Sequence, residues 1–226
     1  MSARQFPLDL EPAPDHRFER FVPGENAWLL THLQGLQAGE APTLISGPSA
    51  SGKTHLLRAL AAQWQSRGHV VQHFDAATRP PWKLLPAARL VLIDEVEQLD
   101  PDQQHAAFAL FIDAIGQGAA VVAASRLPAA ELPLREDLRT RLAWGAGFAL
   151  QPLGEAALRQ LLRQEGQRRG LQLGDDLLEY LMLRFARDAS HLVPLLQRLD
   201  DYAMRTKRAP TVPLLREMLH EEPHPV

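Results

Sequence analysis

The sequence contains no cysteine among its 226 residues, which excludes a disulfide framework and any metal site built on thiolates. No run approaches 18 apolar residues, and the first residues lack the apolar segment of a signal peptide, so neither a membrane span nor a secretory signal is predicted. An excess of basic charge is also missing, with 24 Lys and Arg against 27 Asp and Glu. Because a domain that grips duplex DNA alone usually has a basic face, autonomous DNA binding is disfavoured.

Hydrophobic residues make up 46% of the chain, enough to bury a globular core of one or two domains. Short apolar runs alternate with segments of helical periodicity in the first two thirds of the sequence. This alternation predicts an α/β fold in which helices cover both faces of a parallel sheet, a three-layer arrangement. The expected strands are 43–46, 70–74, 90–93 and 119–124, and the expected helices are 25–37, 55–66 and 101–116.

The pattern changes at Gly154, after which only helical periodicity occurs, near 155–169, 174–186, 189–206 and 212–220. This change predicts a small all-helical second domain. The expected organisation is an extended N-terminal arm, an α/β domain and a small helical domain, with the boundaries 1–17, 18–152 and 153–226.

A glycine-rich segment, GPSASGKT, follows the first expected strand and precedes a helix. Its glycines permit backbone angles that let N–H groups point at a phosphate, while Lys53 reaches the β- and γ-phosphates and Thr54 holds Mg²⁺. The alternative is a glycine turn that matches the pattern by chance. The predicted nucleotide-binding residues here are Gly47, Pro48, Ser49, Ala50, Ser51, Gly52, Lys53, Thr54 and His55.

A second acidic element follows the apolar run Leu90–Ile93. Asp94 lies at the carboxyl end of this expected strand, where ligands bind in open α/β sheets, and is predicted to hold Mg²⁺ through water. Glu95 is predicted to polarise an attacking water. An ordinary solvated acidic turn is the alternative. Together the two elements predict binding of ATP or ADP with Mg²⁺, whereas hydrolysis by the chain itself is less firmly indicated.

With these motifs in view, the chain from Phe18 to Arg216 resembles the AAA+ P-loop ATPases of the DnaA/Hda branch, and most closely the Hda family of DnaA regulatory inactivators. The segment FERFVPGEN is similar to the one that contacts adenine in DnaA-like proteins. The resemblance therefore implies that Phe21 and Val22 contact the base. A hydrophobic staple at a helix start is the other interpretation of these two residues.

The segment REDLRTRLAWG resembles the stretch that carries the family's arginine finger, which maps to Arg141. Such a finger stabilises transition-state charge in a neighbouring subunit's ATP site. Arg139 is the candidate if the alignment with the family motif is shifted by two residues. Without the family resemblance, Arg141 would be interpreted as a surface arginine on a helix.

Two positions depart from the family pattern. The family has a polar residue, called sensor 1, at the end of one strand, and here only Ser125 can take that role. The family's sensor 2 arginine in the lid domain aligns with Ser190. Because a serine cannot replace a guanidinium that contacts phosphate, weak intrinsic ATPase activity at most is expected.

The N-terminal segment QFPLDL resembles the peptide with which replication proteins dock on the sliding clamp. Its predicted contacts are Gln5, Phe6, Leu8 and Leu10, with docking of the arm on its own domain as the alternative. No helix-turn-helix domain follows the lid in this sequence. The resemblance then implies a bacterial cytoplasmic protein at the replisome that docks on the DNA polymerase III clamp (β subunit), touches DNA only through it, and promotes hydrolysis of ATP bound to DnaA. A homo-oligomer is possible within this family.

Three other functions are alternatives to a negative regulator of initiation. A DnaC-like helicase loader predicts a helicase-binding N-terminal domain, for which the arm is too short. A self-sufficient AAA+ ATPase is disfavoured by Ser190. A scaffold with a vestigial loop is disfavoured by the intact Gly47, Lys53 and Asp94.

Overall fold

The computed structural model describes residues 16–185 and 188–221. Its first part is a five-stranded sheet in the order β2-β3-β4-β1-β5, in which all neighbouring strands are parallel. The strands are β1 (Thr43–Ser46), β2 (Val70–Phe74), β3 (Ala88–Ile93), β4 (Ala120–Ser125) and β5 (Ala146–Ala149). The expected parallel α/β sheet is thereby confirmed, and β5 is a strand that the sequence pattern did not predict.

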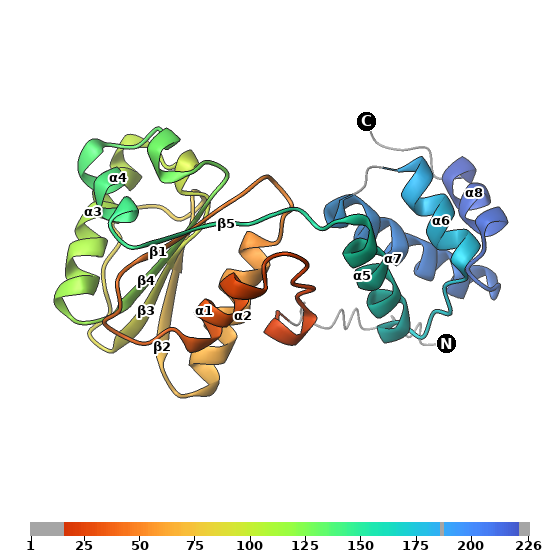
Figure 1. Ribbon diagram of the computed structural model, residues 1–226, viewed down its shortest axis with the longest axis horizontal. Coiled ribbons are helices and arrows are strands. Elements are labelled where there is room, and N and C mark those ends of the chain that lie inside the picture. The colour runs from red at the N-terminus through yellow and green to blue at the C-terminus, as the bar shows by residue number, and fades with distance from the viewer. Residues whose placement is uncertain (1–15, 186–187, 222–226) are drawn as a thin grey trace, which may run out of the picture.

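Helices cover both faces of the sheet, with α1 and α2 on one side and α3 and α4 on the other (Figure 1). Their bounds are α1 (Ala27–Gly35), α2 (Lys53–Ser66), α3 (Pro101–Gly116) and α4 (Glu136–Ala143), with short 3-10 turns η1 (Phe18–Arg20), η2 (Val96–Gln98) and η3 (Ala129–Glu131). Helix α1 is shorter at both ends than the expected 25–37. Helix α3 begins as expected, because Asp100 and Gln103 form a capping box ahead of Pro101.

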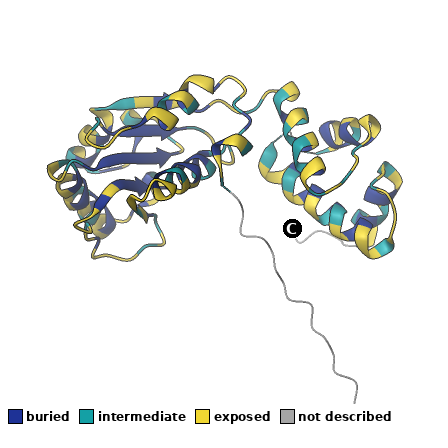
Figure 2. Ribbon diagram, turned by 90° about the horizontal axis from the view of Figure 1, so that it is seen from below, coloured by how far each residue is buried: buried dark blue, intermediate teal, exposed yellow. Residues whose placement is uncertain are grey.

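The two faces of the sheet bury separate apolar clusters. Along β3, Leu90 and Leu92 pack toward α2, whereas Val91 and Ile93 pack toward α3. All four side chains are almost completely buried. Figure 2 shows the central strands β1, β3 and β4 largely in dark blue, between helices whose outer faces are yellow. This double burial is why β3 appears in the sequence as a continuous apolar run.

The helical part begins after β5 and has an apolar core of its own (Figure 1). It consists of α5 (Glu155–Arg168), α6 (Asp175–Arg184), α7 (Ala189–Thr206) and α8 (Val212–Glu221). All four helices lie within two residues of the expected ranges, so these predictions are confirmed. Leucines at helical spacing on α7, including Leu192, Leu196 and Leu199, form the centre of this core. No helix among the described residues is long and apolar enough to cross a membrane.

Candidate functional site

The glycine-rich loop connects β1 to α2 at the carboxyl edge of the sheet. Gly52 has φ +101°, a left-handed conformation that favours glycine, and a Cβ there would lie 2.9 Å from the Phe21 ring. A Cβ on Gly47 would lie 2.8 Å from the carbonyl oxygen of Leu150. The two glycines therefore let the loop pass close to its neighbours and bring its backbone N–H groups to the start of α2.

Lys53 is buried at the first position of α2. Its Nζ donates hydrogen bonds to the carbonyl oxygens of Gly47 and Pro48, each at 2.7 Å. Burial lowers the pKa of Lys53 below its usual 10.5, against the opposing effect of the Glu97 and Asp94 carboxylates. The ammonium thus lies inside the loop where a phosphate cradle needs a cation.

The predicted metal ligands come together from two elements. Thr54 Oγ1 donates to Asp94 Oδ2 at 2.6 Å, and Asp94 Oδ1 accepts a hydrogen bond from the Glu95 N–H at 2.9 Å. Asp94 is only 4% exposed, so its charge is directed into this cluster. A hydroxyl and a carboxylate, with phosphate oxygens and water completing the shell, are the donors that Mg²⁺ prefers, so the residues fit this ion.

Glu95 follows in a left-handed conformation with φ +52° and exposes its side chain. Among the described residues its carboxylate makes no hydrogen bond. It lies at the same sheet edge as Asp94, which is the placement expected for a residue that meets an attacking water.

A cavity of about 1340 Å³ opens between the sheet domain and the helical part. The loop residues from Pro48 to His55 line it together with Phe21, Val22 and Ser190. The Phe21 and His55 rings stack with centroids 6.1 Å apart. The structure therefore brings the predicted base contacts, the phosphate loop and the lid position Ser190 to one cavity of nucleotide dimensions.

Ser125 does not line this cavity. Its side chain is fully buried, and its Oγ bonds the carbonyl oxygen and the N–H of Leu127 at 2.8 and 2.9 Å. The hydroxyl is therefore used to shape the turn after β4. The predicted phosphate contact through this side chain has no support in the observed geometry.

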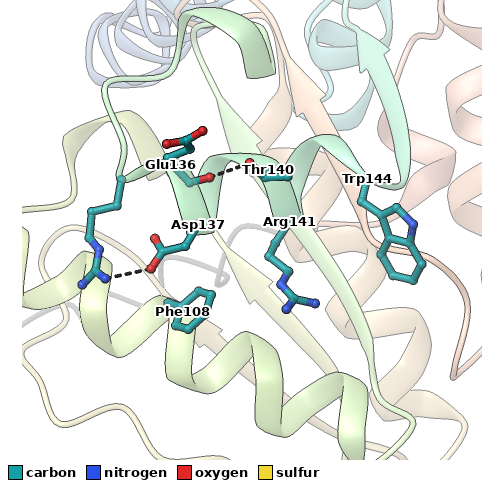
Figure 3. A pocket seen from close by; sticks show the side chains of 7 residues that line it. Phe108, Glu136, Asp137, Thr140, Arg141 and Trp144 are labelled. Atoms are coloured by element: carbon teal, nitrogen blue, oxygen red, sulfur yellow. Dashed lines mark hydrogen bonds and ion pairs between the residues drawn. The ribbon is translucent and has the colours of Figure 1, made fainter.

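Arg141 lies on α4, on the opposite face of the sheet from α2. It lines a separate cavity of about 820 Å³ beside Phe108, Thr140 and Trp144 (Figure 3). This cavity shares no residue with the nucleotide-sized one. Among the described residues the exposed Arg141 guanidinium has no hydrogen-bond or ion-pair partner, whereas Arg139 on the same helix is half-buried.

Trp144 exposes 65% of its surface next to Arg141, and Arg135 is paired with Asp137 at 2.7 Å on the far side of the cavity. Figure 3 shows the Arg141 side chain projecting from α4 between Phe108 and Trp144. An unpaired guanidinium beside an exposed ring is an arrangement suited to contact with another molecule. The predicted clamp contacts Gln5, Phe6, Leu8 and Leu10 lie outside the described residues.

Sequence reasoning missed Asn26, which joins the segment before α1 to the strand–lid connection. Its amide donates to the carbonyl oxygens of Pro23 and Gln151, and its Oδ1 accepts from the Gln151 N–H at 2.7 Å. The side chain is 2% exposed. Only the distant partner at Gln151 reveals this role, so no local pattern could have found it.

Comparison with known proteins places the chain in a structural class. Residues 155–219 match the family model described as "Hda, lid domain". A Haemophilus influenzae protein described as uncharacterized is 29% identical over 231 residues, which covers 96% of this chain and 99% of that protein.

Two solved structures share the fold. Domain III of the Thermotoga maritima replication initiation protein DnaA is similar with a TM-score of 0.79 and 20% identity, over 94% of this chain and 98% of that one. AMPPCP-bound DnaA from Aquifex aeolicus has a TM-score of 0.70 and 19% identity, over 86% of this chain and 68% of that one. The expected fold class, a three-layer parallel sheet domain followed by a small helical lid domain, is thus confirmed.

Proposed function

We propose that the chain is a DnaA-related AAA+ protein and a nucleotide-bound negative regulator of replication initiation. The match of residues 155–219 to the Hda lid-domain model and the fold shared with DnaA domain III support this proposal. The nucleotide, ATP or ADP with Mg²⁺, occupies the cavity between the sheet and the lid. Lys53 and the loop N–H groups bind its phosphates, Thr54 and Asp94 hold the metal, and Phe21 and Val22 contact the base. The bound nucleotide orders the two domains relative to each other.

The regulatory step is carried by Arg141. Its guanidinium is exposed, has no partner among the described residues and lies outside the chain's own nucleotide cavity. This placement supports action on the ATP site of a second AAA+ protein, for which the proposed partner is DnaA. There a fixed planar cation stabilises the charge that develops on the transferring phosphoryl group. Arg139 is the poorer candidate because it is half-buried.

The N-terminal peptide from Gln5 to Leu10 is proposed to dock the protein on the DNA-loaded β clamp. Its glutamine amide and three apolar side chains suit a cleft with a polar rim. This docking raises the effective concentration of Arg141 near DnaA, and the protein then needs no DNA-binding surface of its own. In this role Glu95 and Ser190 support at most slow turnover of the chain's own ATP.

The test is hydrolysis of ATP bound to DnaA in the presence of this protein, clamp and DNA. Arg141→Ala is expected to lower the stimulated rate at least about tenfold, since an arginine finger contributes about 10³–10⁵ in rate. Arg139→Ala on the same helix is the matched control and keeps most of the stimulation. If stimulation requires docking on the clamp, the double change Gln5→Ala and Leu8→Ala abolishes it.

Each alternative has its own outcome in this assay. Loss with Arg139→Ala and not with Arg141→Ala would move the finger by two residues. Stimulation unaffected by either change would exclude the proposed action on DnaA. Rapid steady-state hydrolysis by the chain alone would favour a self-sufficient ATPase.

A further inference from the structure

The part of the sheet domain around β2 carries positive charge that the proposed function does not use. Residues 41–93 form β1, α2, β2 and β3 with their connections, and they contain six lysines and arginines but a single acidic residue, Asp75. The whole chain has 24 basic and 27 acidic side chains. The overall charge balance therefore conceals a local excess of cations in an acidic protein.

Four of the six cations are exposed to solvent. Arg67 lies in the turn between α2 and β2, and Arg89 is the second residue of β3. Arg79 and Lys83 lie in the connection from β2 to β3. In the described part of the chain, none of these four side chains makes a hydrogen bond or an ion pair. By contrast, the four arginines between positions 159 and 169 are each paired with a carboxylate.

The connection between β2 and β3 holds its cations along the edge of the sheet. β2 is the edge strand, next to β3 (Figure 1). The Gln72 side chain on β2 donates to the carbonyl oxygen of Lys83 at 3.0 Å and accepts from the N–H of Leu85 at 2.8 Å, so the connection runs beside the strand. Arg89 lies where the register between β2 and β3 shifts, next to the start of β2. The four cations are therefore placed along one edge and its amino end.

The neighbouring side chains decide which polyanion this edge suits. Asp75 does not neutralise it, because its Oδ1 accepts hydrogen bonds from Thr78 Oγ1 at 2.7 Å and from the Ala77 N–H at 3.1 Å within its own turn. The Phe74 and Trp82 rings are buried and stack on each other with centroids 4.9 Å apart. Neither ring can stack on an unpaired base. The edge thus suits the phosphates of a duplex better than the bases of a single strand.

We propose that the basic edge, defined as Arg67, Arg79, Lys83 and Arg89, binds the phosphate backbone of duplex DNA without reading its sequence. The inference goes beyond the proposed function, in which the protein reaches DNA through the clamp. Each cation that meets a phosphate releases a condensed counterion, and the arginines add a fork of donors to the phosphate oxygens. Four such contacts give weak binding that depends steeply on salt, and docking on the clamp strengthens it by raising the local concentration of DNA.

The test is fluorescence anisotropy of a short labelled duplex titrated with the full chain, without clamp, between about 50 and 200 mM salt. The logarithm of the binding constant should fall against the logarithm of the salt concentration with a slope of about −3 to −4. The double change Lys83→Gln and Arg89→Gln should reduce the magnitude of this slope by about 2 and weaken binding at low salt at least about tenfold.

The matched control is Arg184→Gln with Lys207→Gln, which changes the net charge equally. Both residues are exposed cations of the helical part, without a side-chain partner among the described residues. The control should weaken binding less than about threefold, because these cations lie outside the basic edge. Unchanged midpoints of thermal unfolding report that both double variants are folded.

Three results would overturn the inference. The first is an equal loss of affinity in the two double variants, which would reduce the effect to net charge. The second is binding of a single strand of the same length as tightly as the duplex. The third is binding of polyglutamate as tightly as the duplex, which would favour an acidic protein surface as the partner. Absence of duplex binding by the unaltered chain at low salt would also overturn it, while leaving the proposed docking on the clamp intact.

Discussion

At the scale of single residues, His55 links the nucleotide cavity to the segment before α1. Its ring lies 3.4 Å from that of His16, Nδ1 to Nδ1, and stacks on Phe21. Its Nε2 donates to the Arg17 carbonyl oxygen at 3.1 Å. Burial lowers the pKa of His55 below 6.5, with a smaller effect in the same direction from Arg168. The folded protein therefore binds a proton at this ring less readily than the unfolded chain does.

This difference predicts acid sensitivity with a definite sign. The stability that neutral His55 allows is complete above pH 6.5 and is lost as the pH falls below 6.5 toward the folded pKa. Between pH 7.5 and 5.5 the free energy of unfolding should fall, by at most about 1.4 kcal/mol from this ring for each pH unit below 6.5. Urea unfolding at both pH values measures it.

His55→Gln should make the fall between pH 7.5 and 5.5 smaller. His73 on β2, whose pKa burial also lowers, provides a second contribution. His73→Gln should therefore flatten the profile as well. An unaltered pH profile in His55→Gln would show that this ring does not resist protonation.

At the scale of elements, Asn26 fixes the start of α1 to the connection between β5 and α5. Its three hydrogen bonds to Pro23 and Gln151 satisfy backbone groups that no helix or strand satisfies. Asn26→Ala leaves the N–H and the carbonyl oxygen of Gln151 unpaired at a site with almost no water, whereas the Pro23 carbonyl oxygen keeps its hydrogen bond from the backbone N–H of residue 26. The free energy of unfolding should therefore fall by about 2–3 kcal/mol. Denaturant unfolding monitors the change.

The matched control for Asn26→Ala is Thr31→Ala on the same helix. Thr31 is exposed and its hydroxyl bonds only the Ala27 carbonyl of its own helix, so the expected change is below about 0.5 kcal/mol. A small effect of Asn26→Ala, comparable to that of Thr31→Ala, would mean that water replaces the hydrogen bonds of the Asn26 side chain.

At the scale of the whole molecule, the sheet domain and the helical part have separate apolar cores, and the nucleotide cavity lies between these two parts. A ligand that contacts both the phosphate loop and α7 should stabilise the folded protein by mass action. The free energy of unfolding should rise by about 2.7 kcal/mol at a ligand concentration of one hundred times Kd. We expect Mg²⁺ and ADP to raise the midpoint of thermal unfolding and to slow hydrogen exchange in α2 and α7. Lys53→Ala should remove both effects, and a midpoint that rises equally in that variant would contradict binding at this loop.

The residue pattern of the sequence determined the phosphate loop, a buried strand and most of the helices of this protein. The glycines and Lys53 of the loop, the buried run of β3 and the capping box of α3 are local signals, because spacing and side-chain type dictate them. The four helices of the lid followed from their 3.6-residue periodicity. Strand β5 escaped detection because Ala146–Ala149 is short and contains small residues with little strand preference, and it forms only by pairing with β1.

Only the tertiary structure decided which distant groups meet. It places the Arg126 guanidinium on Glu97, 29 residues earlier in the chain, and closes Asn26 onto Gln151. It also leaves Arg141 on the face of the sheet opposite α2. These outcomes depend on strand order and on burial, and both arise from packing among segments far apart in the chain, which local residue patterns do not encode.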